Sequence, residues 1–186
     1  PIIFSYLFNV TIKNFKTLYI VMTYYDEISS GYEQLHREEQ KNKRLLIQDT
    51  IKPKTSDKLL DVGCGSGVSS EDWDCEVYGI DTSEKLIEQA TKKKIGSFQV
   101  SAGENIPFSD NEFDIVISLT AIHNFTRPDK AIEEMKRVSK KGSLIAITCL
   151  KSRSLEFIEK SVRSNLKVIK EMDETFDKIW ICENEK

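Results

Sequence analysis

The sequence contains few of the residues that mark disulfide-rich, metal-binding or disordered chains. Its 186 residues include four cysteines, four prolines and eight glycines, which is the composition of an ordinary globular protein. The cysteines show no CxxC spacing, and the two histidines, His36 and His123, form no cluster with them. We therefore expect no structural metal site, and this cysteine usage fits a reduced, cytoplasmic compartment best.

An excess of positive charge and a long apolar run are also absent. The chain has 27 Lys and Arg against 30 Asp and Glu, a formal net charge of −3, so no general positive field attracts nucleic acid. Lys13, Asn14 and Lys16 interrupt the apolar start well before the roughly 20 residues that a membrane span requires. The same charges fit a signal peptide poorly. We expect no membrane association.

The length of the chain favours a single domain. Residues 1–21 open without a methionine, and Met22 begins a segment of different character. We interpret Met22 as the natural start and residues 1–21 as an N-terminal extension that is upstream translation or an accessory segment. Residues 22–186 then form one domain, of which residues 22–52 are the N-terminal part.

Strand and helix patterns alternate from residue 33 onward, which requires crossover connections. The alternation predicts an α/β fold in which a mostly parallel sheet has helices on both faces. The last two strands are too close in sequence for a crossover and should form an antiparallel hairpin. Helices are predicted at 33–52, 82–94, 128–140 and 152–166, and strands at 58–62, 76–80, 97–102, 113–119, 143–150, 166–174 and 177–183.

The chemistry begins where the first predicted strand ends, in Asp61-Val62-Gly63-Cys64-Gly65-Ser66-Gly67. Glycines at alternate positions let a backbone approach a ligand closely and adopt positive φ. Asp61 adds a carboxylate, and Asp81 ends the second strand, where an acid can accept hydrogen bonds from both ribose hydroxyls. The pattern indicates a nucleoside-containing ligand.

The spacing of the glycines narrows the choice of nucleoside. A dinucleotide fingerprint needs glycine at position 68, which is valine here, and a Walker motif needs a Gly-Lys-Ser/Thr end that is absent. The pattern (D/E)xGxGxG resembles that of the class I S-adenosylmethionine-dependent methyltransferases, in particular the small type 11 methyltransferase domain. The resemblance runs from about Tyr24 to the C-terminus and includes the blocks at 79–90, 102–116 and 133–147.

This resemblance implies a fold, a cofactor and a cofactor site. The fold is a three-layer, Rossmann-like sheet of seven strands in the order 3-2-1-4-5-7-6, with the last strand antiparallel. The cofactor is S-adenosyl-L-methionine: Asp61 and the glycine backbone would hold its methionine moiety, and Asp81 its ribose. The cofactor-binding residues implied in this way are Asp61, Gly63, Cys64, Gly65, Gly67, Asp81, Thr82, Gly103, Glu104, Thr120 and Tyr25.

Two departures from the family pattern affect the expected site. Ala102 stands where the family usually has Asp or Ser, so adenine recognition should depend on the Gly103 amide, helped by Glu104. The segment at 68–75 is too short for the helix that the family has between its first two strands. We expect either a single helical turn there or a partly open face of the sheet.

The acceptor side should involve residues 120–125, after the fourth strand, and the aromatic segment Tyr24–Tyr32, which the family commonly uses as a lid. Tyr25 and Tyr32 serve equally well as lid contacts or as packing for the first helix. His123 is the candidate general base, and the alternative is a solvated or structural histidine. Lys41, Lys43 and Arg44 are interpreted as a solvated helix face, with contact to RNA phosphates as the alternative.

The acceptor itself is less constrained. The (N/D)PP(Y/F/W) signature is replaced by SLTAIHNF at 118–125, which argues against N6-adenine and glutamine-amide methylation. The leading hypothesis is a methyltransferase acting on a small molecule by in-line methyl transfer, which needs alignment more than acid or base chemistry. The alternatives are a tRNA or rRNA methyltransferase and a non-catalytic binding module that resembles a methyltransferase.

Overall fold

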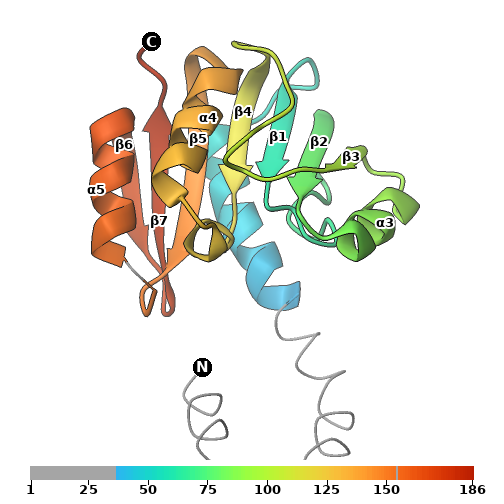
Figure 1. Cartoon of the computed structure of the whole chain (residues 1–186), viewed down its shortest axis with the longest axis horizontal. Coiled ribbons are helices and arrows are strands. Elements are labelled where there is room, and N and C mark those ends of the chain that lie inside the picture. Colours follow the sequence, from blue (N-terminus) through green and yellow to red (C-terminus); the bar gives the residue numbers. More distant parts are fainter. Residues whose placement is uncertain (1–36, 154) are drawn as a thin grey trace, which may run out of the picture. The chain divides into compact units, whose positions relative to one another are not determined.

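The computed structural model describes residues 37–153 and 155–186, and residues 40–186 form one compact unit. This unit contains a seven-stranded sheet with helices on both faces (Figure 1). No helix of the described part is long and apolar enough to cross a bilayer. The strands are β1 (Lys58–Val62), β2 (Glu76–Asp81), β3 (Ser97–Val100), β4 (Phe113–Ser118), β5 (Ser139–Leu150), β6 (Lys167–Asp173) and β7 (Asp177–Glu183). The helices are one at 37–51, α3 (Glu84–Lys92), the 3-10 helix η1 (Ile122–Asn124), α4 (Pro128–Val138) and α5 (Leu155–Asn165).

The strand order is β3-β2-β1-β4-β5-β7-β6, which confirms the predicted topology. The first five strands pair in parallel, whereas β7 is antiparallel to both β5 and β6. Only a short turn joins β6 to β7, so the chain must reverse direction there. β7 lies between β5 and β6, and because it runs antiparallel to β5, its first residue is paired with the last residue of β5.

Alternate residues of the central strands face two separate cores, as the strand period requires. Leu60 and Val116 belong to the core under α4 and α5, and Leu59 belongs to the other core. Ile47 and Ile51 of the helix at 37–51 pack into that second core. Figure 1 shows α4 and α5 on one side of the sheet and this helix, in light blue, on the other.

The boundary between α4 and β5 differs from the prediction. The helix ends at Val138 instead of residue 140, and β5 begins at Ser139 instead of residue 143. Ser139 has an extended backbone, with φ −79° and ψ 143°, and pairs with Phe113 of β4. Asn184 Nδ2 donates hydrogen bonds to Ser139 O (3.1 Å) and Oγ (2.8 Å). Tertiary contacts therefore end the helical pattern earlier than its periodicity indicates.

The segment between β1 and β2 contains neither of the expected arrangements. Residues 63–75 form turns with no helix, yet this face of the sheet is covered, because Trp73 packs into the second core. Trp73 Nε1 donates to Ser69 O at 2.8 Å. Arg44, on the helix at 37–51, pairs with Asp72 Oδ2 at 2.8 Å. Trp73 and the Arg44–Asp72 ion pair therefore pack this segment against the rest of the fold without a helix.

Candidate active site

The glycine loop, residues 63–67, leaves the carboxyl end of β1 in a conformation that favours glycine. Gly63, Gly65 and Gly67 have φ of +81°, +53° and +78°, in the left-handed region that other residues rarely adopt. A Cβ on Gly63 would lie 2.5 Å from Ala121 Cβ, a distance that no real pair of carbons tolerates. The loop is therefore packed directly against the segment that follows β4.

Asp81, at the carboxyl end of β2, is bonded to the glycine loop. Its Oδ2 accepts a hydrogen bond from Gly65 N at 2.9 Å, and its Oδ1 accepts one from Ser83 N at 2.9 Å. Ser83 is the N-cap of α3, and exposed Thr82 lies between the two. An ionised carboxylate has about four acceptor sites, so Asp81 keeps capacity for two further donors.

Asp61 lies one step deeper and is fully buried. Its Oδ2 accepts hydrogen bonds from Ser69 Oγ (2.6 Å) and Ser70 Oγ (2.7 Å), whereas Oδ1 has no partner in the part of the chain described. Burial raises the pKa of Asp61 to about 6, the nearby charge of Asp81 adds to the rise, and the two hydroxyls oppose it. Among residues 37–153 and 155–186, no cation pairs with this buried carboxylate.

The two serines that bind Asp61 were not predicted as site residues. The sequence signal was available in part, since Ser69 and Ser70 stand in the short 68–75 segment directly after the glycine loop. Their direction toward Asp61 depends on the turns of that segment. Cys64, in the loop itself, is buried, and burial together with the charge of Asp61 raises the pKa of its thiol far above the usual range. Cys64 is therefore a packing residue without nucleophilic character.

Gly103 and Glu104 form part of the wall beside the loop. Gly103 is buried, and a Cβ on it would lie 2.7 Å from Phe125 Cε2 and 3.1 Å from Val62 Cγ1. Glu104 Oε1 accepts a hydrogen bond from Arg127 N at 3.0 Å, at the start of α4. Glu104 therefore ties the segment after β3 to the segment after β4, and its role toward adenine stays a prediction.

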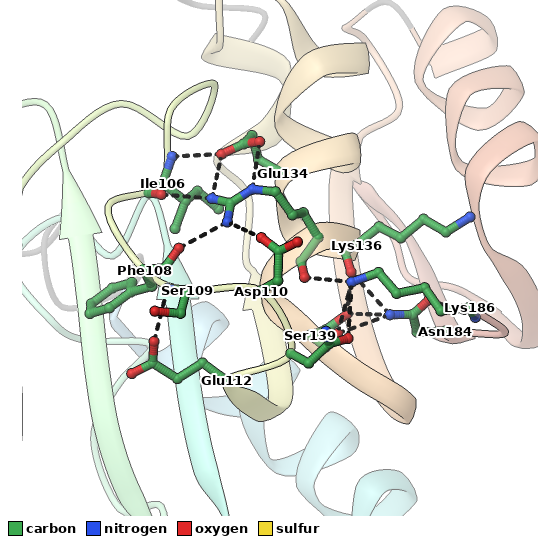
Figure 2. Close-up of polar contacts among 12 residues, drawn as sticks. Ile106, Phe108, Ser109, Asp110, Glu112, Glu134, Lys136, Ser139, Asn184 and Lys186 are labelled. Carbon is green, nitrogen blue, oxygen red and sulfur yellow. Dashed lines mark hydrogen bonds and ion pairs between the residues drawn. The ribbon is translucent and has the colours of Figure 1, made fainter.

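A charged network fixes the chain that continues from this wall (Figure 2). Arg137 of α4 donates to Ile106 O at 2.8 Å and Phe108 O at 2.9 Å, and pairs with Asp110 at 2.7 Å. Glu134 Oε2 accepts from Arg137 Nη2 at 2.8 Å and from Ile106 N at 3.1 Å. Arg137 and Glu134 together bind both backbone groups of Ile106, so they hold the segment that follows Gly103 against α4.

Thr120 belongs to the predicted acceptor side and lies two residues after the end of β4. Its backbone N–H donates to Thr148 Oγ1 at 2.6 Å, and its hydroxyl accepts from Lys43 Nζ at 3.0 Å. His123 follows on η1 and is half-buried, with Nδ1 unpartnered among the residues described. Burial lowers the pKa of His123, the charge of Arg153 lowers it further, and Asp177 opposes this. The surroundings of His123 therefore disfavour the charged imidazolium form.

The interpretation of Lys43 and Arg44 as a solvated helix face is wrong. Their side chains are only 4% and 2% exposed. Lys43 Nζ lies 2.5 Å from Asp177 Oδ2, and Asp177 is fully buried. Lys41 is exposed, as expected. The sequence could not reveal this, because Lys43 and Asp177 are on the first described helix and the last strand.

The predicted lid falls outside the described part of the chain. This applies to Tyr24, Tyr25 and Tyr32, and also to residues 1–21 and Met22. The structure brings the other predicted site residues to one edge of the sheet, at the carboxyl ends of β1, β2, β3 and β4. Ligands of open α/β sheets bind at this edge.

Comparisons with known proteins point to one family. Residues 60–147 match the family model described as a methyltransferase domain. A demethylmenaquinone methyltransferase of Paenarthrobacter aurescens is 31% identical over 136 residues, which cover 68% of this chain and 53% of that protein. A malonyl-[acyl-carrier protein] O-methyltransferase of Enterobacter lignolyticus is 28% identical over 140 residues, covering 73% of this chain and 56% of that protein. The chain thus spans about half the length of the curated relatives it matches.

A solved structure shows the same fold. A SAM-dependent methyltransferase from Aquifex aeolicus matches with a TM-score of 0.67 and 20% identity. The match covers 76% of this chain and 89% of that one. At this identity the likeness concerns the fold alone.

Proposed function

We propose that this chain, which matches a methyltransferase domain over residues 60–147 and has the strand order expected of that fold, binds S-adenosyl-L-methionine and transfers its methyl group to a small-molecule acceptor. The observation that carries the proposal is the contact between Asp81 and the glycine loop, with Gly65 N 2.9 Å from Asp81 Oδ2. This contact places the acid that we assign to the ribose beside a loop that a ligand can approach closely.

The residues at these strand ends fit the chemistry of the cofactor. Buried Asp61 Oδ1 lacks a partner among the described residues, and the cationic ammonium end of the cofactor would neutralise it. Asp81 keeps acceptor capacity for two ribose hydroxyls. We assign the adenine to the Gly103 amide and Thr82, since Ala102 offers no side-chain acceptor. When bound, S-adenosylmethionine supplies a methyl group already activated by its sulfonium.

His123 is the group that we assign to proton transfer. It stands three residues after Thr120, and the lowering of its pKa by burial favours the uncharged imidazole, which is the form that a general base requires. A base is needed only when the acceptor atom must lose a proton. For other acceptors, the main requirement is alignment and exclusion of water, which the packing of Ala121 against Gly63 supports.

A small molecule is the acceptor class that the observations favour. Two relatives are named for methylating demethylmenaquinone and malonyl-[acyl-carrier protein]. Lys43 and Arg44 are buried in ion pairs, so this helix offers RNA phosphates fewer cations than its sequence suggests. Residues 118–125 also lack the motif that grips a planar amino group.

The test combines a binding measurement with a transfer measurement. Isothermal titration with S-adenosylmethionine should show binding to the wild-type chain and weaker binding to Asp81→Asn. Transfer from methyl-labelled S-adenosylmethionine is then measured with reduced demethylmenaquinone, malonyl-acyl carrier protein and bulk tRNA as separate acceptors. We expect label in a small-molecule product. Label in tRNA alone would favour RNA methylation. If S-adenosylmethionine binds but no label reaches these acceptors or any fraction of a cell extract assayed in the same way, the chain is a binding module.

His123→Gln separates the two chemical contributions. If His123 is a general base, the change lowers turnover by about 10² to 10⁴ with little change in the affinity for S-adenosylmethionine. Asp49→Asn is the control, because Asp49 is an exposed helix position outside the predicted acceptor segment at 120–125. Equal turnover in the two variants would remove His123 from the chemistry and leave alignment as the main contribution.

A further inference from the structure

The backbone of Thr120, in the segment between β4 and η1, is strained. Its φ is +56°, a left-handed value that β-branched residues rarely adopt. The other non-glycine residues with positive φ in the described part are two lysines, an aspartate and an asparagine, none of them β-branched. Such a conformation persists only where the surrounding structure holds it in place.

Groups from three elements hold Thr120. Thr148 of β5 accepts a hydrogen bond from Thr120 N at 2.6 Å. Lys43, on the helix at 37–51, donates to the Thr120 hydroxyl at 3.0 Å, and the same hydroxyl lies 3.5 Å from Asp177 Oδ1 of β7. Lys43 and Asp177 pair with each other at 2.5 Å. We call these four residues the Thr120 cluster.

Burying the Lys43–Asp177 ion pair of the cluster costs desolvation free energy that offsets the attraction between the two charges. Lys43 is 4% exposed and Asp177 is fully buried, so both charges have lost their water. A buried pair commonly contributes no more than well-packed apolar residues would, and its best-attested use is to specify one conformation. Here both charged side chains contact the hydroxyl of Thr120, so the conformation that they would specify is that of Thr120.

The conformation of Thr120 decides where the next residues lie. Ala121 follows it and occupies the space beside Gly63, where a Cβ would clash at 2.5 Å. Asn124 N donates to Ala121 O at 2.8 Å, so η1, which carries His123, starts from the same residue. A change of φ at residue 120 would move Ala121 and His123 relative to the glycine loop.

We propose that Thr148, Lys43 and Asp177 are positioning residues for methyl transfer, which hold Thr120 in its left-handed conformation and so fix η1, which carries His123, relative to the glycine loop. This inference rests on the proposed function. It predicts that the cluster affects the transfer step more than it affects the affinity for the cofactor.

Thr148→Val is the primary test, because valine keeps the shape of threonine and removes the hydroxyl that binds Thr120 N. With methyl-labelled S-adenosylmethionine and reduced demethylmenaquinone, we expect kcat to fall at least tenfold, while the Kd for S-adenosylmethionine changes less than threefold. Ser118→Ala is the matched control, since Ser118 Oγ is buried on β4 with no partner in the described structure. It should change both quantities less than twofold.

A glycine background separates positioning from simple loss of stability. Glycine adopts positive φ without strain, so in this background the left-handed conformation of residue 120 no longer has to be held against strain. We expect Thr148→Val to lower kcat less than threefold in a Thr120→Gly background, against at least tenfold in the wild type. An equal loss in the two backgrounds, or a wild-type kcat for Thr148→Val, would overturn the proposal.

An NMR measurement distinguishes failure of the positioning proposal from failure of the proposed function. The chain has two histidines, so the imidazole signals of His123 are assigned by their loss in His123→Gln. Thr148→Val should shift these signals, and the Thr120→Gly background should suppress the shift. If the wild type transfers no methyl group but this pattern holds, the positioning stands and the proposed function fails. Unshifted His123 signals overturn the positioning regardless of activity.

Discussion

The buried carboxylate of Asp61 should make the stability of the ligand-free protein fall as pH rises. Burial raises its pKa from 3.8 to about 6, so the folded state favours the protonated form. Between about pH 4 and pH 6 the folded protein then binds more protons than the unfolded chain, and raising the pH favours unfolding. A rise of about two pKa units corresponds to about 3 kcal/mol of unfolding free energy. This destabilisation is complete above pH 6 and absent below pH 4.

Asp61→Asn removes this titration and keeps one oxygen to accept from Ser69 and Ser70. Urea unfolding followed by circular dichroism from pH 4 to pH 7 gives the unfolding free energy of each variant. We expect the wild type to lose about 3 kcal/mol relative to Asp61→Asn over this range. Asp49→Asn, a change on an exposed helix position, serves as control and should run parallel to the wild type. Parallel curves for the wild type and Asp61→Asn would refute the reasoning.

Three further changes test the site and its supports. Titrations with S-adenosylmethionine should show affinity falling below about pH 6, because a cationic ligand favours ionised Asp61, and a pH-independent affinity would contradict this. Asp81→Asn should weaken that affinity at least tenfold by removing charge-assisted hydrogen bonds of about 1.5 to 3 kcal/mol each, and unchanged titration curves would take Asp81 out of the site. Arg137→Gln should lower the unfolding free energy by about 2 kcal/mol in urea, since it removes the donor to Ile106 O and the arginine partner of Glu134, and an unchanged midpoint would show that the network is dispensable.

The fold was accessible from the sequence because its determinants are local and periodic. Alternating strand and helix patterns fix a parallel sheet, since parallel strands need crossovers. The short connection before Asp177 fixes one antiparallel reversal. The exact strand order was predicted from the resemblance to a family, and the observed order confirms that prediction.

The candidate site was accessible only where the motif is contiguous or lies at a strand end. Glycines at 63, 65 and 67 have positive φ, as their alternation predicts, and Asp81 meets the loop because adjacent parallel strands end at the same edge. The assignment of these residues to a cofactor stays a prediction. The end of α4 was placed too late, because the pairing of Ser139 with Phe113 lies outside any local pattern.

The sequence by itself determined the sheet, the edge where the motifs gather and the residue types of the loop. Only the tertiary structure decided which charges are buried and what they contact. Lys43 is a surface lysine by helical pattern, yet it pairs with Asp177 because the helix at 37–51 packs across the sheet that β7 completes. Ser69 and Ser70 meet Asp61 because turns replace a helix. Such contacts join residues that no local sequence pattern relates, so they can be identified only in the folded structure.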